Sequence, residues 1–252
     1  SRTFVYSYIG EEMHWIYGRD YVRAPKGSTY TDENGTVIDC SGMPIIDPKT
    51  GYPSLIEDPN QRIAKVNPDW KAGFGTSVRY KNLSFSAQFT AQVGGNSFSV
   101  TNFALSYQGK LKNSLPGRED GLVLKGVNAV DNGDGTISYR KNNTITENVY
   151  IYYNKYQWVR DNTKANTFST DFLKLKEVRL DYRFSERWMQ KTKFLRSASI
   201  GIFATNLFCI TNWPQYDPEA AGVVSGTNIY GGIETGSFPM TRTYGFNIKL
   251  QF

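Results

Sequence analysis

Residues able to carry chemistry are few in this chain. His14 is its single histidine, and Cys40 and Cys209 are its two cysteines. A structural zinc site needs four ligands of these kinds, and this set does not supply them. We therefore expect His14 to be an ordinary loop residue. We predict no metal, no other cofactor and no catalytic residue, so the chain is not expected to be an enzyme.

The segment DNGDGT at 131–136 is similar to the start of a calcium-binding loop but does not meet its requirements. Gly133 and Gly135 stand where side-chain ligands are needed, and Asn142 stands where a bidentate Glu is needed. Asp and Gly residues before a β-prone run predict a hairpin tip instead. Two alternatives stay open for the cysteines: Cys40 and Cys209 form a disulfide, or both keep free thiols.

Aromatic residues are the stronger candidates for contact with a ligand or a partner. Their faces stack on sugar rings or pack on peptide side chains, while their polar tips form hydrogen bonds. The alternative is that the rings stabilise long loops or meet another protein, because aromatics are enriched at interfaces. The predicted contact residues are Tyr152, Tyr153, Tyr156, Trp158, Trp213, Tyr216 and Tyr230.

The elements that position these loops are β-strands. Residues 241–252 read TRTYGFNIKLQF, with apolar residues at every second position from Tyr244 to Phe252. This alternation predicts a strand with one apolar face, and its length suits a tilted membrane crossing of about 9 to 11 residues. The edge strand of a soluble sandwich has the same pattern. Further strands are predicted at 72–80, 83–93, 170–184 and 197–208, with a weaker one at 2–9.

Two local features refine this pattern. The two-residue connection 81–82 predicts a tight hairpin between the strands at 72–80 and 83–93. In 170–184 the apolar positions change from odd to even near Lys176. A β-bulge near Lys176 explains the change, as does a strand that leaves a bilayer partway along.

The connections between the predicted strands alternate between short and long. Those at 81–82 and 185–196 are short, whereas 10–71, 94–169 and 209–240 are long. Outer-membrane barrels have this asymmetry, with short periplasmic turns and long extracellular loops. The sequence therefore favours an all-β transmembrane barrel. Its predicted lipid-facing and interfacial residues are Tyr80, Phe85, Phe89, Phe184, Tyr244, Phe246 and Phe252.

The formal net charge of +6 raises the question of nucleic-acid binding. A nucleic-acid surface needs its basic residues on one presented face. The long connections together carry no surplus of positive charge, and the excess lies in the strand segments. We therefore predict no nucleic-acid partner.

Several uncommon motifs occur in order along the chain, and together they resemble the C-terminal part of a SusC/RagA-type TonB-dependent transporter. The terminal strand follows Phe238-Pro239 and Thr241-Arg242-Thr243. The other motifs are Asn67-Pro68-Asp69-Trp70 with Gly73-Phe74, the hairpin YKNLSFSAQF, Gly94-Gly95-Asn96, DFLKLKEVRL at 171–180, Thr205-Asn206-Leu207-Phe208 and Tyr216-Asp217-Pro218-Glu219.

This resemblance implies a nutrient importer in the bacterial outer membrane. The implied barrel has about 22 strands, so the strands of residues 1–252 are expected to be a C-terminal fragment with no plug domain or TonB box. The implied partners are the remainder of the transporter, a SusD-like surface lipoprotein, TonB through the missing part, and outer-membrane lipid. A glycan and a peptide stay open as cargo. The alternative function is a secreted all-β carbohydrate-binding module.

Overall fold

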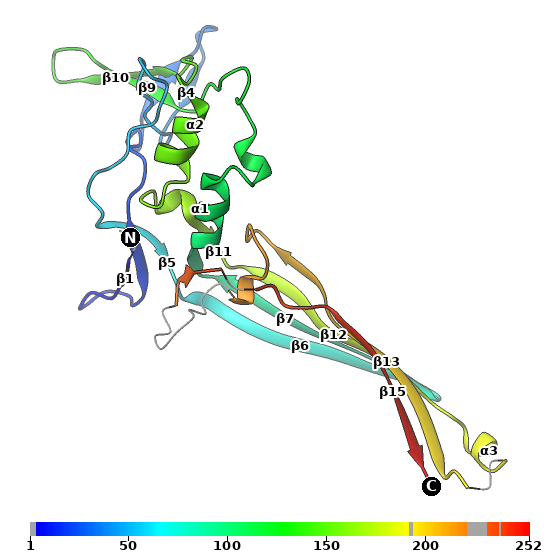
Figure 1. Cartoon of the computed structure of the whole chain (residues 1–252). Coiled ribbons are helices and arrows are strands. Elements are labelled where there is room, and N and C mark those ends of the chain that lie inside the picture. Colours follow the sequence, from blue (N-terminus) through cyan, green and yellow to red (C-terminus); the bar gives the residue numbers. More distant parts are fainter. Residues whose placement is uncertain (1–3, 192–193, 221–230, 237) are drawn as a thin grey trace.

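The computed structural model describes residues 4–191, 194–220, 231–236 and 238–252 (Figure 1). A long, narrow sheet extends from a folded region that we call the outer domain, made of 4–66, 95–170, 212–220 and 231–236. Most elements are strands, and the helices in the described residues are short. The predicted all-β class is therefore confirmed, while the described strands form an open sheet and no closed barrel.

The long sheet has five antiparallel strands in the order β15-β13-β12-β7-β6. Strands that follow one another in this sheet along the chain are also neighbours in space. Their bounds are β6 Pro68–Tyr80, β7 Leu83–Gly94, β12 Phe172–Arg183, β13 Ser197–Thr211 and β15 Thr243–Gln251. β6, β7 and β13 extend the segments predicted at 72–80, 83–93 and 197–208. β12 and β15 are slightly shorter than the segments predicted at 170–184 and 241–252.

The strand register brings the apolar positions of all five strands to one face. Phe74 of β6 pairs with Phe89 of β7, and their rings stack with centroids 5.1 Å apart. At the other side of the sheet, Ile202 of β13 pairs with Phe246 of β15. Because side chains alternate along a strand, the Ser, Thr, Gln and charged residues between these positions fall on the opposite face.

The predicted bulge in β12 is confirmed. Its pairing with β7 passes from Leu175 to Glu177, so Lys176 has no partner opposite it. The pairing with β13 is irregular at the same level, where Asn206 adopts a positive φ of 53°. The extra residue shifts the side-chain alternation by one, which keeps apolar side chains on one face both above and below the bulge.

The outer domain consists of short strands and helices. Three small sheets are β1-β2-β5, the hairpin β3-β4 and the hairpin β9-β10, and a fourth, β11-β8-β14, contains the parallel pair β14-β8. The strands are β1 Phe4–Tyr6, β2 Trp15–Gly18, β3 Thr29–Thr31, β4 Val37–Asp39, β5 Gln61–Lys65, β8 Asn96–Ser99, β9 Val127–Asp131, β10 Ile137–Lys141, β11 Thr167–Ser169 and β14 Ile233–Glu234.

Helical segments lie between the outer-domain sheets and at the far end of the long sheet. The α-helices are α1 Val100–Tyr107, α2 Val149–Ile151 and, at the far end of the long sheet, α3 Glu186–Met189. A π-helical segment, η2 Tyr152–Gln157, continues α2 directly. The 3-10 turns are η1 Lys112–Ser114, η3 Lys164–Asn166 and η4 Pro218–Ala220.

One predicted strand is corrected by the structure. The segment 2–9 was expected as a strand of the barrel wall, yet β1 covers only Phe4–Tyr6 and pairs with β2 in the outer domain. With 3 residues, β1 is too short to span a membrane, for which about 9 to 11 residues are needed. The long sheet therefore has five strands in the described residues rather than six.

The joint between the long sheet and the outer domain is built from the Gly94-Gly95-Asn96 motif. Gly94 and Gly95 have φ values of 78° and 83°, and a Cβ at Gly95 would lie 2.8 Å from the carbonyl oxygen of Val66. Only glycine adopts this conformation at so close an approach. The amide of Gly94 donates to Asp171 Oδ1 at 2.6 Å, and Asn96 Nδ2 donates to the Lys65 carbonyl at 3.1 Å. These contacts fix the direction in which the chain leaves β7.

The outer domain has small apolar cores rather than one large one. Ala24, Cys40 and Val127 form one buried cluster, and Val149, Tyr153 and Trp158 form another. In the described residues, no helix combines the length and the apolar character needed to cross a membrane.

Candidate functional site

The apolar face of the long sheet is exposed along its whole length. Phe246 is 73% exposed, and Val78 and Ile202 are each 58% exposed. A soluble monomer rarely exposes a contiguous apolar surface of this kind, and such surfaces mark contacts with proteins or membranes. The other exposed apolar residues of the face include Phe74, Tyr80, Leu83, Phe85, Tyr182, Ile200, Phe208, Ile210, Tyr244, Ile248 and Leu250.

Aromatic rings gather at the end of the sheet that lies far from the outer domain. Tyr80 precedes the 81–82 turn, and Phe184 follows β12 with its ring 6.0 Å from that of Trp188. Phe252 stacks on Phe194 with centroids 6.3 Å apart. Trp188 and Phe194 were not predicted as members of this group. They lie in the 185–196 connection, which has no alternation to indicate where its rings point.

The opposite face of the sheet is polar. Arg179 of β12 forms a two-point ion pair with Asp181, at 2.5 and 2.9 Å. A Cβ at Gly201 would lie within 3 Å of Asp181, so this glycine leaves room for the carboxylate. The sheet thus separates an apolar surface from a charged and hydrogen-bonding one.

A buried ion-pair cluster ties the 209–240 connection to the polar face of β12. Lys174, only 2% exposed, donates to Asp217 Oδ2 and Glu219 Oε2, each at 2.5 Å. Lys176 donates to the same Glu219 oxygen at 2.6 Å. Burial acts to raise the pKa of Glu219, but the hydrogen bonds from the two lysines outweigh it and hold that pKa below its ordinary value. We call these four residues the lysine latch.

Four of the predicted contact aromatics come together beside α2. Tyr153 and Trp158 stack with ring centroids 4.9 Å apart, and both are buried. Tyr152 packs against Tyr153 at 5.0 Å, and Tyr156 stacks on Tyr52 at 4.8 Å. Because the Tyr153 and Trp158 rings face the interior, they contribute here to the core of the outer domain.

Hydrogen bonds join this aromatic group to the first long connection. The Tyr21 and Tyr152 hydroxyls both donate to Gln157 Oε1, the second at 3.1 Å. Burial raises the pKa of Tyr152 to about 12, and the neighbouring Tyr153 adds to the effect. This raised pKa favours the protonated hydroxyl, which donates to Gln157.

The other three predicted aromatics are separate from this group. Trp213 is buried, with its ring edge-on to Phe168 at 6.1 Å. Tyr216 is exposed next to the lysine latch and has a positive φ of 55°. Tyr230 lies outside the described residues.

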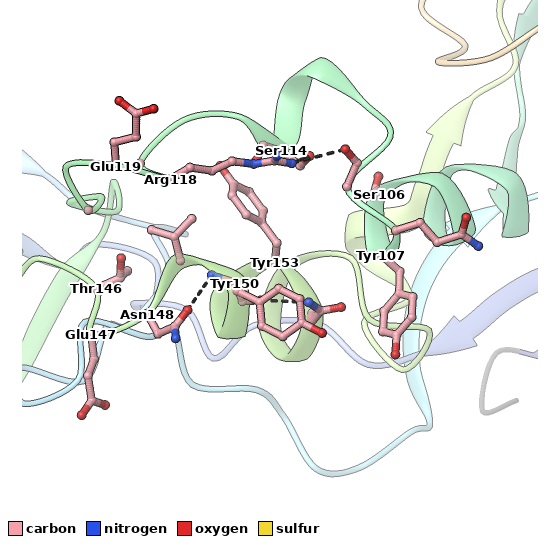
Figure 2. Close-up of a pocket in the computed structure, with 16 residues that line it drawn as sticks. Ser106, Tyr107, Ser114, Arg118, Glu119, Thr146, Glu147, Asn148, Tyr150 and Tyr153 are labelled. Carbon is pink, nitrogen blue, oxygen red and sulfur yellow. Dashed lines mark hydrogen bonds between the residues drawn. The ribbon is translucent and has the colours of Figure 1, made fainter.

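A cavity of about 640 Å³ opens between α1, η1 and α2 (Figure 2). Tyr107 lies at its α1 end, Arg118 extends over Tyr153, and Tyr150 lies on α2. The sequence did not predict this cavity, because its walls come from three separated segments. One local signal in the sequence indicates α2, the helix that lines the cavity. Asn148 caps this helix and accepts a hydrogen bond from the Tyr150 amide at 2.9 Å.

The remaining candidates from the sequence have simple outcomes. His14 is an exposed loop residue with a φ of 61°. Cys40 is buried and free, and Cys209 is exposed and free, so the structure does not join them. Residues 132–136 form the tip of the β9-β10 hairpin, as the DNGDGT motif predicts.

Comparisons with known proteins agree with the motifs. No family model matches the sequence. The chain is 25% identical over 252 residues to TonB-dependent receptor P3 of Formosa agariphila, a match that covers 96% of this chain and 22% of the receptor. The chain thus spans about a fifth of the length of that relative.

Solved structures of the RagAB peptide importer share the fold. The closed-closed state gives a TM-score of 0.54 at 17% identity, covering 95% of this chain and 23% of the importer chain. The open-open state gives 0.54 at 19% identity, covering 95% and 26%. The resemblance to SusC/RagA-type TonB-dependent transporters is confirmed.

Proposed function

We propose that this chain forms part of the wall and the extracellular region of a TonB-dependent importer in a bacterial outer membrane. The cargo is a bulky nutrient, a glycan or a peptide, and it crosses without chemical change. The single observation that carries the proposal is the exposed apolar face that runs unbroken across five strands. Lipid is the environment that such a face requires.

The length and ends of the sheet support this placement. Its shortest strand, β15, has 9 residues, and its longest, β13, has 15. Tilted membrane strands need about 9 to 11. The aromatic group around Tyr80, Phe184 and Phe252 then forms the interfacial girdle at the periplasmic end, together with Trp188 and Phe194. Phe85, Phe89, Tyr244 and Phe246 face lipid between the two interfaces.

The outer domain then lies outside the cell, because it is at the end of the sheet opposite the short turns (Figure 1). Its described residues come mainly from the predicted long connections 10–71, 94–169 and 209–240, whose ends belong to β6, β7 and β13. The first two connections pack together, as the hydrogen bond from the Tyr52 hydroxyl to the Asn148 carbonyl at 3.1 Å illustrates. A rigid extracellular region of this kind suits contact with a SusD-like lipoprotein and with cargo.

The two edge strands of the sheet need further strands to pair with. In the described part of the chain, β6 and β15 each pair on one side only. An unpaired edge in lipid leaves backbone groups unsatisfied at a cost of several kcal/mol each. The remainder of the transporter supplies the neighbouring strands in this proposal, to a total of about 22 for a plugged barrel. TonB acts through that remainder.

Fractionation of cells that make the complete protein tests the proposal. We expect the protein in the outer-membrane fraction, released by detergent but not by salt. We also expect its mobility in gel electrophoresis to change on boiling, as that of a closed barrel does. A protein that is soluble and monomeric without detergent would instead favour a secreted carbohydrate-binding module and refute the importer.

A further inference from the structure

We propose that the end of the long sheet far from the outer domain binds an anionic phospholipid of the periplasmic leaflet. This inference rests on the proposed function for its membrane placement, and it adds a preference for one class of lipid. Three observations carry it: aromatic rings on the apolar side of the sheet, exposed cations beside them, and few anions to neutralise those cations.

Two ring contacts place the 185–196 connection on the apolar side of the sheet. Phe184 continues the apolar face of β12, because its amide donates to the Ala198 carbonyl at 3.0 Å and so extends the strand pairing. The Trp188 ring stacks on Phe184, and the Phe194 ring stacks on Phe252 at the end of β15. Trp188 and Phe194 are 63% and 66% exposed, so much of each residue is open to contact with lipid.

The short helix α3 gives this connection a defined shape at the far end of the sheet (Figure 1). Met189 is buried, and its amide donates to the Ser185 carbonyl at 3.2 Å. The turn continues to Lys191, whose amide donates to the Trp188 carbonyl at 3.3 Å. Arg187 and Lys191 are both exposed. Side chains four positions apart lie on the same side of a helical turn, so these two cations lie near each other beside Trp188.

Two more cations lie at the same end of the sheet. Arg196 precedes β13 and falls on its apolar side, because Ala198 and Ile200 of that side follow at every second position. The amide of Arg196 is hydrogen-bonded to β15 at 2.7 Å, which holds it beside the end of that strand. Lys81 lies in the turn between β6 and β7, with Nζ 5.3 Å from the centre of the Tyr80 ring. A long basic side chain at the rim of an apolar surface extends its charge to the level of the headgroups.

These cations carry a positive charge that the protein does not neutralise. Glu186 is the one acidic residue of the sequence 185–196. Within the described residues, no ion pair involves Lys81, Arg187, Lys191 or Arg196. An anionic phospholipid supplies the missing charge, since guanidinium and ammonium groups form charge-assisted hydrogen bonds to phosphate oxygens. The exposed rings beside the cations favour a lipid over a soluble acidic protein, because such rings accumulate at membrane–water interfaces.

The fluorescence of Trp188 in the complete transporter tests the site. The protein is reconstituted in vesicles of phosphatidylcholine mixed with brominated phosphatidylglycerol or with brominated phosphatidylcholine. The Trp188 signal is obtained by subtracting the fluorescence of Trp188→Phe. We expect brominated phosphatidylglycerol to quench Trp188 at a lower mole fraction than brominated phosphatidylcholine does. Arg187→Gln and Lys191→Gln should each reduce this preference about fivefold, and high salt should reduce it too.

Lys26→Gln and Lys110→Gln are the matched controls, because they remove exposed lysines of the outer domain and should keep the preference. The proposal is overturned if the double variant Arg187→Gln/Lys191→Gln keeps the preference, or if inorganic phosphate abolishes it more strongly than chloride of equal ionic strength. Equal quenching by the two lipids would overturn this inference alone and leave an acidic periplasmic protein as the partner of the cations. Quenching of Trp188 by neither lipid would contradict the membrane placement itself and so overturn the importer proposal as well.

Discussion

Phe246→Arg tests which face of the sheet meets lipid. Phe246 lies in the middle of β15, is 73% exposed and pairs with Ile202 of β13. An arginine on the lipid face of a barrel costs about 2 to 4 kcal/mol near the midplane and little near the interfaces. Since Phe246 is the fourth of nine residues in β15, we expect a cost toward the upper end of this range. That corresponds to about a hundredfold or more in the folded-to-unfolded ratio.

The measurement is urea unfolding of the complete transporter in phospholipid vesicles, followed by its heat-dependent mobility in gels. Asn247→Arg is the control, because the neighbouring residue points to the polar face, where Gly201 of β13 lies opposite it. We expect Asn247→Arg to cost much less, since its charge lies on the water-facing side near Asp181. Equal destabilisation by the two variants, or normal assembly of Phe246→Arg in vesicles, would show that the apolar face is not turned to lipid.

Three further predictions concern the outer domain and its joint. Lys174→Met should lower the free energy of unfolding by about 3 to 5 kcal/mol, because it leaves two acidic partners without their buried cation. Limited proteolysis should cut the 209–240 connection faster in this variant than in Lys176→Met, because Lys176 is the more exposed lysine. Burial acts to raise the pKa of Glu234, but hydrogen bonds from Thr101 and Ser99 hold that pKa below its ordinary value of 4.5. The ionised carboxylate therefore contributes its full stabilisation above pH 4.5. This stabilisation is lost as the pH falls through the lower pKa of the folded state. We expect the melting temperature of Glu234→Gln to decline less steeply below pH 4.5 than that of the unaltered protein. Identical curves of melting temperature against pH would contradict this prediction. Gly95→Ala should lower the free energy of unfolding, measured by chemical denaturation, by more than about 1 kcal/mol. Gly133→Ala is the control and should lower it less, because Gly133 also has a positive φ but its Cβ would meet open space. Equal losses of stability would mean that the close contact at the joint is unimportant.

The long sheet could be predicted because its pattern is local. One face of each strand is apolar and the other polar, so β7 and β15 show strict alternation in their sequences. Even the bulge at Lys176 leaves a trace, because an extra residue changes the phase of the alternation. The prediction for 2–9 was wrong because the β-prone run Phe4–Tyr6 resembles the start of a longer strand, although β1 ends after three residues.

The outer domain could not be predicted in this way, because distant residues hold it together. Ile45 forms a parallel bridge with Val127, and the Tyr52 hydroxyl bonds Asn148, a residue 96 positions away. Neither contact imposes a period on its neighbours. The aromatics of 94–169 were predicted from composition alone, and composition does not distinguish buried Trp158 from exposed Tyr150.

The lysine latch neutralises part of the positive charge that the sequence places in the strands. In the sequence, Lys174 and Lys176 contribute to a cationic surplus and would attract an anionic cargo if they faced an open channel. In the structure, Asp217 and Glu219 from the 209–240 connection neutralise both of them at 2.5 to 2.6 Å. Below the bulge, Arg179 is likewise neutralised by Asp181. Because these three cations already have acidic partners, the polar face of β12 offers little net attraction to an anion.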